Sequence, residues 1–287
     1  MIARWHVSLS GRSRSGSFWS MKSSLPPLFP TSLLPVAANR SIISLFVVIV
    51  TIITSSCAVS AEEMNNSVER TCRITVWPPY LLRGEKIPFA SFDGNVLCII
   101  GDITRNEANE AIRILKENDI RNIYIWSGGG DSAAALDIAD QIRTMDIDIY
   151  VWQLCASSCA NYLFLAASRK HVLPESVVAW HAVPHADPSD PAVFQQLDRR
   201  HREFFEGLGL DDALAGRLPC HWNENRQFRM AVMKGKRPAW TYSKRELEEH
   251  FHVQGIEEMW WPKSQHALSL MLRKSKMPPV YIFHTCS

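Results

Sequence analysis

Short apolar runs alternate with helix-forming stretches through the middle of the chain, and this alternation constrains the fold more than any other feature. The apolar runs are residues 96–100, 122–126, 147–153 and 177–180. The stretches between them suit helices of about 10 to 15 residues, and strands separated in this way form βαβ units whose strands lie parallel. The sequence therefore predicts an α/β fold with a mainly parallel sheet.

Capping signals mark where the intervening helices begin. Thr104–Glu107 forms a capping box before a stretch whose apolar residues recur at helical spacing. Asp131 is placed to cap a second helix, and an almost entirely apolar third helix is expected over Ser158–Ala167. Beyond Pro188 the pattern becomes mainly helical, with a second capping box at 243–246. We therefore expect a helical C-terminal part.

The N-terminal segment has the composition of an export signal. No acidic residue precedes Glu62, while basic residues recur up to Arg40. The apolar run Ile42–Ile53, about 12 residues long, leads to the small residues Val59–Ala61, which suit cleavage before Glu62. The sequence predicts an exported, periplasmic protein, because the positive charges stay on the cytoplasmic side.

Two alternatives to a cleaved signal peptide remain open, as does the position of the start codon. Residues 42–61 approach the roughly 20 residues that a membrane span needs, so they can instead remain as an anchor in the inner membrane. Cys57 can be lipidated, although Thr54–Ser56 matches a lipobox poorly. The basic region is also long enough for translation to begin at Met21.

The chain divides into four segments with different expected roles. Residues 1–61 are the signal peptide or anchor, 62–90 an N-terminal extension, 91–256 the domain with the alternating pattern, and 257–287 a C-terminal tail. The formal net charge of +2 argues against a nucleic-acid surface. No cysteine or histidine spacing points to a metal site, and no motif points to a cofactor.

Six of the seven cysteines would remain after cleavage, and an oxidising compartment permits disulfides among them. They are Cys72, Cys98, Cys155, Cys159, Cys220 and Cys286. Cys155 and Cys159 are near enough in sequence to bond across a strand–helix turn, and two packed free thiols are the alternative. Cys98 lies within an apolar strand and is expected to be a buried, unbonded side chain.

Three short motifs at the edges of regular elements hold the parts of a serine-nucleophile site. Ser127–Gly130 ends a strand-like run, and its consecutive glycines leave backbone N–H groups unshielded. Ser157 and Ser158 stand where a strand gives way to a helix, next to its unpaired amides. His181 follows the last strand-like run. Acyl transfer needs an activated hydroxyl, a base within hydrogen-bond distance and N–H groups aimed at the oxyanion.

Each motif also has a purely structural explanation. The glycines suit a tight turn, a serine is a good N-cap, and a single histidine at a strand end is commonly a packing residue. The three motifs are therefore informative as a set.

In their order and spacing, Tyr124–Gly130, Ala156–Ser158 and Leu173–His181 resemble the Clp protease proteolytic subunit family, and more narrowly its exported bacterial members. The resemblance covers about residues 96–181 and continues weakly to residue 256. It implies the ββα superhelix shared with crotonases, a peptide or protein substrate, and assembly into homo-oligomers.

The resemblance also implies roles for individual residues. In the family, a glycine pair and the amide after the serine form the oxyanion hole, and the histidine is the base. Carried over to this chain, Gly129 and Gly130 belong to the oxyanion hole and His181 is the base.

Two adjacent serines compete for the role of nucleophile. Ser158 is preferred, because Tyr162 then follows it at the spacing of the family helix, and Cys159 would supply the second oxyanion amide. Ser157 is the alternative, because it fits a Cys-x-Ser spacing common in the exported relatives.

One departure from the family pattern bears on activity. The family's third residue is an aspartate, expected near residues 237–242, where this chain has no acid. The site is then a Ser-His dyad, uses Asp187 or Asp190 instead, or is inactive.

The sequence thus favours an exported serine hydrolase, a peptidase acting through a covalent acyl-enzyme. One alternative is a catalytically inactive binding or scaffold protein with the same fold. Another is a crotonase-like enzyme acting on an acyl thioester, against which export argues, because coenzyme A belongs to the cytoplasm.

Overall fold

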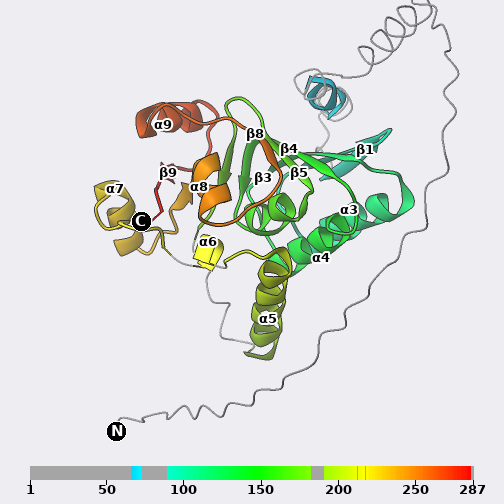
Figure 1. The fold of residues 1–287 in the computed structure, drawn as a ribbon, viewed down its shortest axis with the longest axis horizontal. Helices are drawn as coiled ribbons and strands as arrows, with labels where there is room; N and C mark the ends of the chain where they lie inside the picture. The colour runs from blue at the N-terminus through cyan, green and yellow to red at the C-terminus, as the bar shows by residue number, and fades with distance from the viewer. Residues whose placement is uncertain (1–65, 73–88, 182–190, 212, 217, 286–287) are drawn as a thin grey trace, which may run out of the picture. The chain divides into compact units, whose positions relative to one another are not determined.

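The computed structural model describes residues 66–72, 89–181, 191–211, 213–216 and 218–285, and Figure 1 shows their arrangement. The segment assigned to a signal peptide or anchor, residues 1–61, lies outside them, as does most of the N-terminal extension. Within the described residues, no helix combines the length and the apolar character that crossing a membrane requires.

A seven-stranded sheet forms the centre of the fold, in the order β1-β2-β3-β4-β5-β8, with β6 paired to β4. Its strands are β1 (Ala90–Asp93), β2 (Val96–Ile100), β3 (Asn122–Ser127), β4 (Asp148–Ala156), β5 (Arg169–Val172), β6 (Val177–Ala179) and β8 (Ile256–Met259). The edge strand β1 is antiparallel to β2, and every other pair in this sheet is parallel. The predicted α/β fold with a mainly parallel sheet is confirmed.

Strand β4 changes partner midway. Its first half pairs with β5 and its second half with β6. The change occurs at Gln153, which has a φ of +57° and donates its N–H to the Ser176 hydroxyl at 2.9 Å. The second half of β4 leads into η1 (Cys159–Phe164), a π-helical segment whose residues are all buried. The turn between β4 and η1 therefore lies at the carboxyl ends of three parallel strands, where open α/β sheets form ligand sites.

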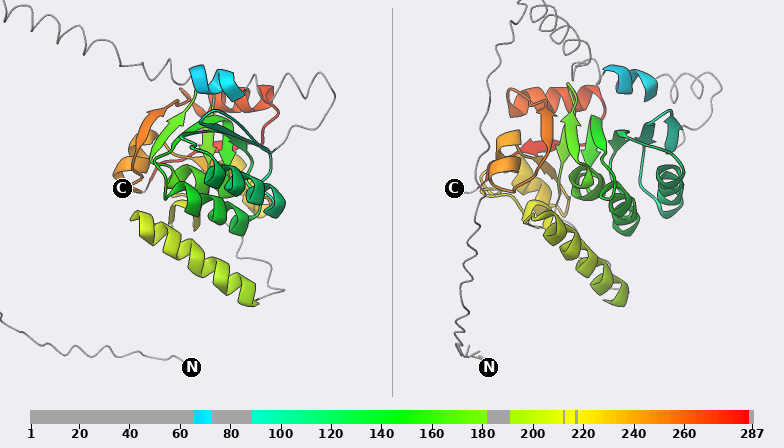
Figure 2. Two further views of the ribbon diagram at one scale, coloured as in Figure 1. Left: turned by 90° about the vertical axis from the view of Figure 1, so that its right-hand side faces the viewer. Right: turned by 45° about the vertical axis from the view of Figure 1, so that its right-hand side comes forward.

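Two helices cover one face of the sheet (Figure 2). They are α3 (Arg105–Glu117) and α4 (Ser132–Ile142), and their apolar sides pack with strand residues in the main core. The capping box at Thr104–Glu107 is formed, and the carboxylate of Asp131 accepts the N–H of Ala134 at 2.9 Å. Both predicted helix starts are confirmed.

A helical segment at residues 66–72 packs on part of the opposite face of the sheet. Its Val68 and Cys72 pack against strand residues that include Tyr124 and Tyr150. Cys72 forms a disulfide with Cys98, with Cα atoms 5.7 Å apart. The expectation that Cys98 is unbonded is therefore wrong, because its partner comes from a segment that only the fold brings to this face.

The C-terminal part is mainly helical, as predicted. Its elements are α5 (Pro191–Leu208), α6 (Ala213–Gly216), α7 (Arg226–Met233), β7 (Ala239–Thr241), α8 (Lys244–Glu249), α9 (Gln265–Lys274) and β9 (Val280–Ile282). Helix α5 extends away from the sheet (Figure 2). The capping box expected at Ser243 and Glu246 is formed at the start of α8. Strands β7 and β9 pair in parallel, and Trp240 of β7 exchanges two backbone hydrogen bonds with Trp180, at 2.7 and 2.8 Å.

The described residues 257–285 of the segment expected to be a tail are part of the same compact unit as the sheet. Leu268 and Leu272 of α9 are fully buried and pack with Leu154 and Ala179 of the central sheet. The difference arises because the apolar partners of this segment lie about a hundred residues earlier in the chain, so a local pattern cannot identify them.

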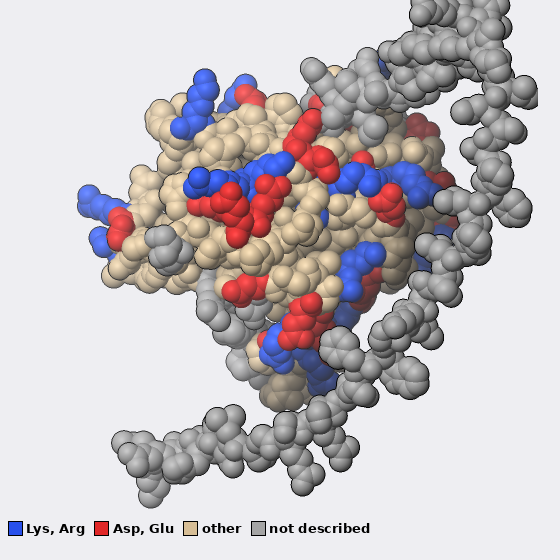
Figure 3. All heavy atoms as spheres, in the orientation of Figure 1, with Lys and Arg blue, Asp and Glu red and all other residues tan. Residues whose placement is uncertain are grey.

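Charges of both signs are interspersed on the face of the molecule in Figure 3. Ion pairs connect α5 to α4, since Arg200 of α5 lies 2.8 Å from Asp137 and 3.0 Å from Asp140 of α4. Partly exposed pairs of this kind contribute roughly 0–1 kcal/mol each, so they orient α5 more than they stabilise the fold.

Lys170 of β5 is a buried cation with a stability cost. Its ammonium donates to the carbonyl oxygens of Ala167 at 2.6 Å and Gln254 at 2.8 Å. Burial lowers the pKa of Lys170 from 10.5 to about 8. As the pH rises, the folded protein therefore releases this proton before the unfolded chain does. The free energy of unfolding increases with pH between the folded pKa of about 8 and the unfolded pKa of 10.5, and this increase is lost as the pH falls back through the folded pKa.

We expect Lys170→Met to remove this pH dependence. The free energy of unfolding of the wild type minus that of the variant should grow by about 3 kcal/mol from pH 8 to pH 10.5, as measured by urea unfolding. Lys116→Met, which changes an exposed lysine of α3, is the matched control and should follow the wild type. Parallel pH profiles for wild type and Lys170→Met would contradict the prediction.

Candidate active site

The turn after β3 presents the glycines of the first motif. Ser127 is buried at the end of the strand, and its hydroxyl accepts the N–H of Gly129 at 3.0 Å. Ile103 holds the turn from the other side, donating its N–H to the Gly129 carbonyl at 2.9 Å and accepting the N–H of Asp131 at 2.8 Å. The peptide planes of Gly129 and Gly130 are therefore held on both sides.

Only glycine fits two of these positions. Gly129 has a φ of +93° and Gly130 a φ of +150°, which other residues rarely adopt. A Cβ at Gly129 would lie 2.7 Å from the Ala156 carbonyl oxygen and 2.7 Å from Ser157 Cβ, and at Gly130 it would lie 2.1 Å from the Ile103 carbonyl oxygen. The glycine turn thus lies directly against the turn that carries the two serines.

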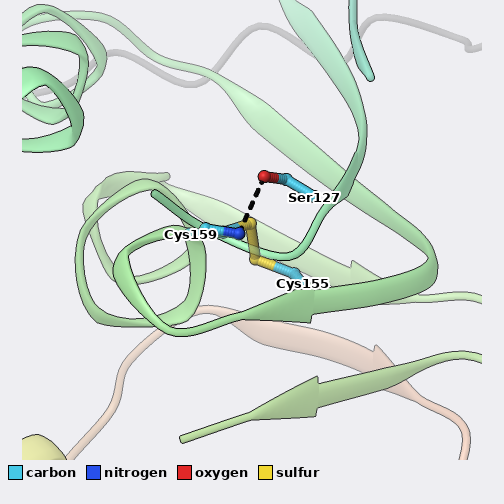
Figure 4. The surroundings of a disulfide bond; sticks show 4 residues. Ser127, Cys155 and Cys159 are labelled. Carbon is cyan, nitrogen blue, oxygen red and sulfur yellow. Dashed lines mark hydrogen bonds between the residues drawn. A yellow bond between two sulfur atoms is a disulfide. The ribbon is translucent and has the colours of Figure 1, made fainter. Parts of the chain in front are cut away.

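Ser157 occupies the turn between β4 and η1 in a left-handed conformation, with a φ of +58°. Its N–H donates to the Ala179 carbonyl of β6 at 3.0 Å, and its carbonyl accepts the N–H of Asn161 at 2.8 Å. Figure 4 shows Cys155 and Cys159 bonded to each other on the two sides of this turn, with Ser127 nearby. A left-handed serine at a strand–helix turn is uncommon, and such conformations persist where the surrounding structure determines them.

His181 lies within hydrogen-bond distance of Ser157. The two atoms, His181 Nε2 and Ser157 Oγ, are 2.7 Å apart. The histidine directly follows Trp180, which is completely buried and held by its backbone hydrogen bonds to Trp240. The imidazole is therefore fixed beside the Ser157 hydroxyl by the end of β6 and by β7.

Ser158 has a different environment from Ser157. It is 1% exposed, and its hydroxyl donates to the Gly130 carbonyl at 3.3 Å. The structure therefore brings His181 to Ser157 and not to Ser158, the serine that sequence reasoning preferred. The preference for Ser158 relied on helical spacing after the serine, which cannot detect the left-handed turn at Ser157.

The glycine turn and the serine turn each present one backbone N–H group without an acceptor among the described residues. Within the described residues, neither the Gly130 N–H nor the Ser158 N–H has a hydrogen-bond acceptor. The Gly129 N–H, by contrast, is bonded to Ser127. Of the two glycine amides expected in an oxyanion hole, Gly130 N–H is therefore without an acceptor in the described residues and Gly129 N–H is bonded.

The region where the family carries an aspartate is strand β7 and its flanks. Strand β7 (Ala239–Thr241) contains no acid. Asp187 and Asp190, the other acids considered for this role, lie outside the described residues. In the described part of the chain, no group of three or more His, Cys, Asp and Glu side chains could hold a metal ion.

Ser127 was part of the predicted glycine motif, but no role was predicted for its hydroxyl. Its hydroxyl holds the Gly129 amide, which leaves the next amide of the turn without an acceptor. The available signal was a serine immediately before three glycines at the end of a strand, because serine hydroxyls commonly bond backbone groups two residues on.

Comparison with known proteins places this site in a described family. Residues 90–186 match the model of the family described as Clp protease, and this segment is a Clp protease family domain that contains the glycine turn, both serines and His181. No curated protein matches the chain. The mixed α/β architecture is that of a ClpP/crotonase-like fold. Members of the family act on peptides or proteins and oligomerise.

Proposed function

We propose that this Clp protease family domain is an exported serine peptidase with Ser157 as nucleophile and His181 as general base. The single observation that carries the proposal is the 2.7 Å separation between Ser157 Oγ and His181 Nε2, beside two backbone N–H groups without acceptors in the described residues. A hydroxyl, a base and oxyanion donors in contact are the requirements of acyl transfer.

The chemistry would proceed in two halves. Ser157 Oγ attacks the scissile carbonyl carbon while His181 Nε2 takes the hydroxyl proton, and the carbonyl oxygen becomes an oxyanion facing the N–H groups of Gly130 and Ser158. The C–N bond then breaks, and His181 returns the proton to the leaving amine. Water, activated by the same histidine, hydrolyses the acyl-serine. Each oxyanion donor of this kind is worth roughly 10²–10³ in rate.

The position of Ser157 next to η1 adds to this effect. The first N–H groups of a helical segment have no intrahelical acceptor and carry partial positive charge, which favours an anion close to them. The Ser158 N–H belongs to this end of η1, directly after the nucleophile.

A second candidate function is a binding or scaffold protein that keeps the fold without catalysis. The absence of an acid from β7 favours it, since an orienting aspartate can be worth about 10⁴ in rate. A working site would be a Ser-His dyad or would use Asp187 or Asp190. A crotonase-like thioester enzyme is the weaker third possibility, because the proposed export separates it from coenzyme A.

Export rests on the N-terminal pattern of basic, apolar and small residues, with residues 42–61 as the cleaved signal or as an inner-membrane anchor. Two disulfides, Cys72–Cys98 and Cys155–Cys159, support an oxidising compartment such as the periplasm. N-terminal sequencing of protein recovered from a periplasmic fraction tests cleavage before Glu62, and recovery only from the cytoplasm would contradict export. Self-association is part of the same proposal, and a monomer in sedimentation velocity would contradict it.

Fluorophosphonate labelling of the mature protein tests the proposed activity. We expect stoichiometric labelling of the wild type, and a fall in rate on the order of 10³-fold or more for His181→Ala, because the serine loses its base. Intact-mass spectrometry measures the labelled fraction, and circular dichroism checks that both proteins are folded. A folded wild type that does not label would favour the binding protein.

A further inference from the structure

We propose that the Cys155–Cys159 disulfide is a positioning element of the hydrolase site, which holds Ser157 in its left-handed turn and keeps the oxyanion amides next to it. The inference rests on the proposed serine-hydrolase function and concerns how the groups of that site are held in position.

The disulfide encloses the nucleophile. Cys155 lies two residues before Ser157 in β4, and Cys159 lies two residues after it at the start of η1 (Figure 4). The bond closes a loop of five residues whose centre is Ser157. Both cysteines are completely buried in the main core. The two ends of the turn are therefore tied to each other and to the core.

The backbone conformation of Ser157 explains why this turn needs such a constraint. Ser157 has a φ of +58°, a conformation that residues other than glycine and asparagine adopt reluctantly. Rotation of this residue toward an ordinary helical or extended conformation would swing Oγ away from His181 Nε2, which lies 2.7 Å from it. The closed loop excludes most of these rearrangements, because its ends cannot separate.

The same bond also connects to the glycine turn. Cys155 is the register partner of Ser127 across β3 and β4. Ser127 in turn accepts the Gly129 N–H at 3.0 Å. Glycine 129 lies so close to the serine turn that a Cβ on it would be 3.0 Å from the Ser158 nitrogen. The disulfide thus lies where the strand carrying the nucleophile meets the strand carrying the oxyanion glycines.

Burial indicates a permanent constraint. Both cysteines have 0% exposure, so a dithiol reductant cannot reach the sulfur atoms without opening of the fold. Reduction consumes two electrons and two protons and leaves two thiols in place of the bond. The site should therefore depend on oxidation when the protein folds, and resist mild thiol reductants afterwards.

The test compares two pairs of substitutions. Cys155→Ala/Cys159→Ala removes this disulfide, and Cys72→Ala/Cys98→Ala removes the one on the opposite face of the sheet as the matched control. The measured quantities are the limiting rate constant of fluorophosphonate labelling, the final labelled fraction, the pH profile of the rate and the thermal midpoint. For Cys155→Ala/Cys159→Ala we expect the limiting rate constant to fall about 10²-fold, since a misplacement of about 1 Å can have this effect. The final labelled fraction should still be complete. We expect the control pair to label within about twofold of wild type.

The outcomes separate three situations. A wild type that does not label rejects the proposed hydrolase and this inference with it. Labelling of wild type and Cys155→Ala/Cys159→Ala at equal limiting rates rejects the positioning role alone. A lower labelled fraction with an unchanged rate and pH profile of the folded molecules also rejects it, because that pattern indicates only a contribution to stability.

A second measurement applies if the double variant does not fold. Residues 144–169 form one tryptic peptide that contains Cys155, Ser157 and Cys159, so its mass reports the label and the redox state together. Wild type prepared in a series of thiol–disulfide buffers is labelled for a short time, alkylated and digested. We expect the label on peptides that keep the disulfide. Equal labelling of the reduced, alkylated peptide in folded protein would overturn the inference.

Discussion

Replacing Ser157 with alanine is expected to abolish fluorophosphonate labelling and any peptide hydrolysis, with a loss on the order of 10⁶-fold, because it removes the hydroxyl that lies 2.7 Å from His181 Nε2. Ser158→Ala removes the same atom one residue later and should leave labelling within about tenfold of wild type. Its hydroxyl makes a single long hydrogen bond, 3.3 Å to the Gly130 carbonyl, and a bond of this kind contributes roughly 1 kcal/mol. Labelling rates and the mass of the modified peptide measure both effects.

The pair of adjacent serines makes this comparison unusually well controlled. The two variants differ only in which of two neighbouring residues loses its hydroxyl, and circular dichroism of both checks that their folding is matched. Labelling that survives in Ser157→Ala and disappears in Ser158→Ala would show that Ser158 is the nucleophile, and the second oxyanion donor would then be the Cys159 N–H. The geometry of His181 predicts the opposite result.

Gly129→Ala should have the second largest effect, and it should act on both activity and stability. The new Cβ would lie 2.7 Å from the Ala156 carbonyl oxygen and 2.7 Å from Ser157 Cβ, and the φ of +93° disfavours any side chain. The clash pushes the glycine turn and the serine turn apart, which displaces the Gly130 N–H from the oxyanion position. We expect the labelling rate to fall by roughly 10²–10³. We expect the free energy of unfolding to fall by about 1–3 kcal/mol.

Gly128→Ala is the matched control for this substitution. A Cβ at Gly128 meets only Asp102 Oδ1, at 3.8 Å, which is ordinary contact. The substitution also leaves Gly129 and Gly130 unchanged. We expect the control to label at nearly the wild-type rate and to unfold at nearly the wild-type urea concentration. Equal effects of the two substitutions would mean that the turn as a whole, and not its contact with Ser157, limits the reaction.

Much of the fold was predictable because it follows from local patterns. Four of the strands from Val96 to Trp180 and the helices between them could be read from apolar runs and their spacing, whereas β5 (Arg169–Val172) was not among the predicted strands. The helix starts at Thr104, Asp131 and Ser243 could be read from side chains that cap nearby amides. These signals act over a few residues, so the sequence records them directly.

The parts of the candidate site were predictable as a set, and their pairing was not. The glycine turn, the two serines and His181 could be identified as motifs at element edges, and the structure does bring them together. The choice between Ser157 and Ser158 depends on a φ of +58° at Ser157. That dihedral angle is imposed by β4, β6 and η1 together, so no spacing rule detects it.

The sequence by itself determined the class of fold, the alternation of four strands with the helices between them, and the small set of residues from which a hydrolase site could be built, since each depends on neighbours within a few positions. Only the tertiary structure decided that Cys98 bonds to Cys72, that residues beyond 256 cover β4 and β6, and that His181 faces Ser157. Each of these depends on contact between segments that are 24 or more residues apart, and such contacts arise from packing of the whole chain rather than from any local preference.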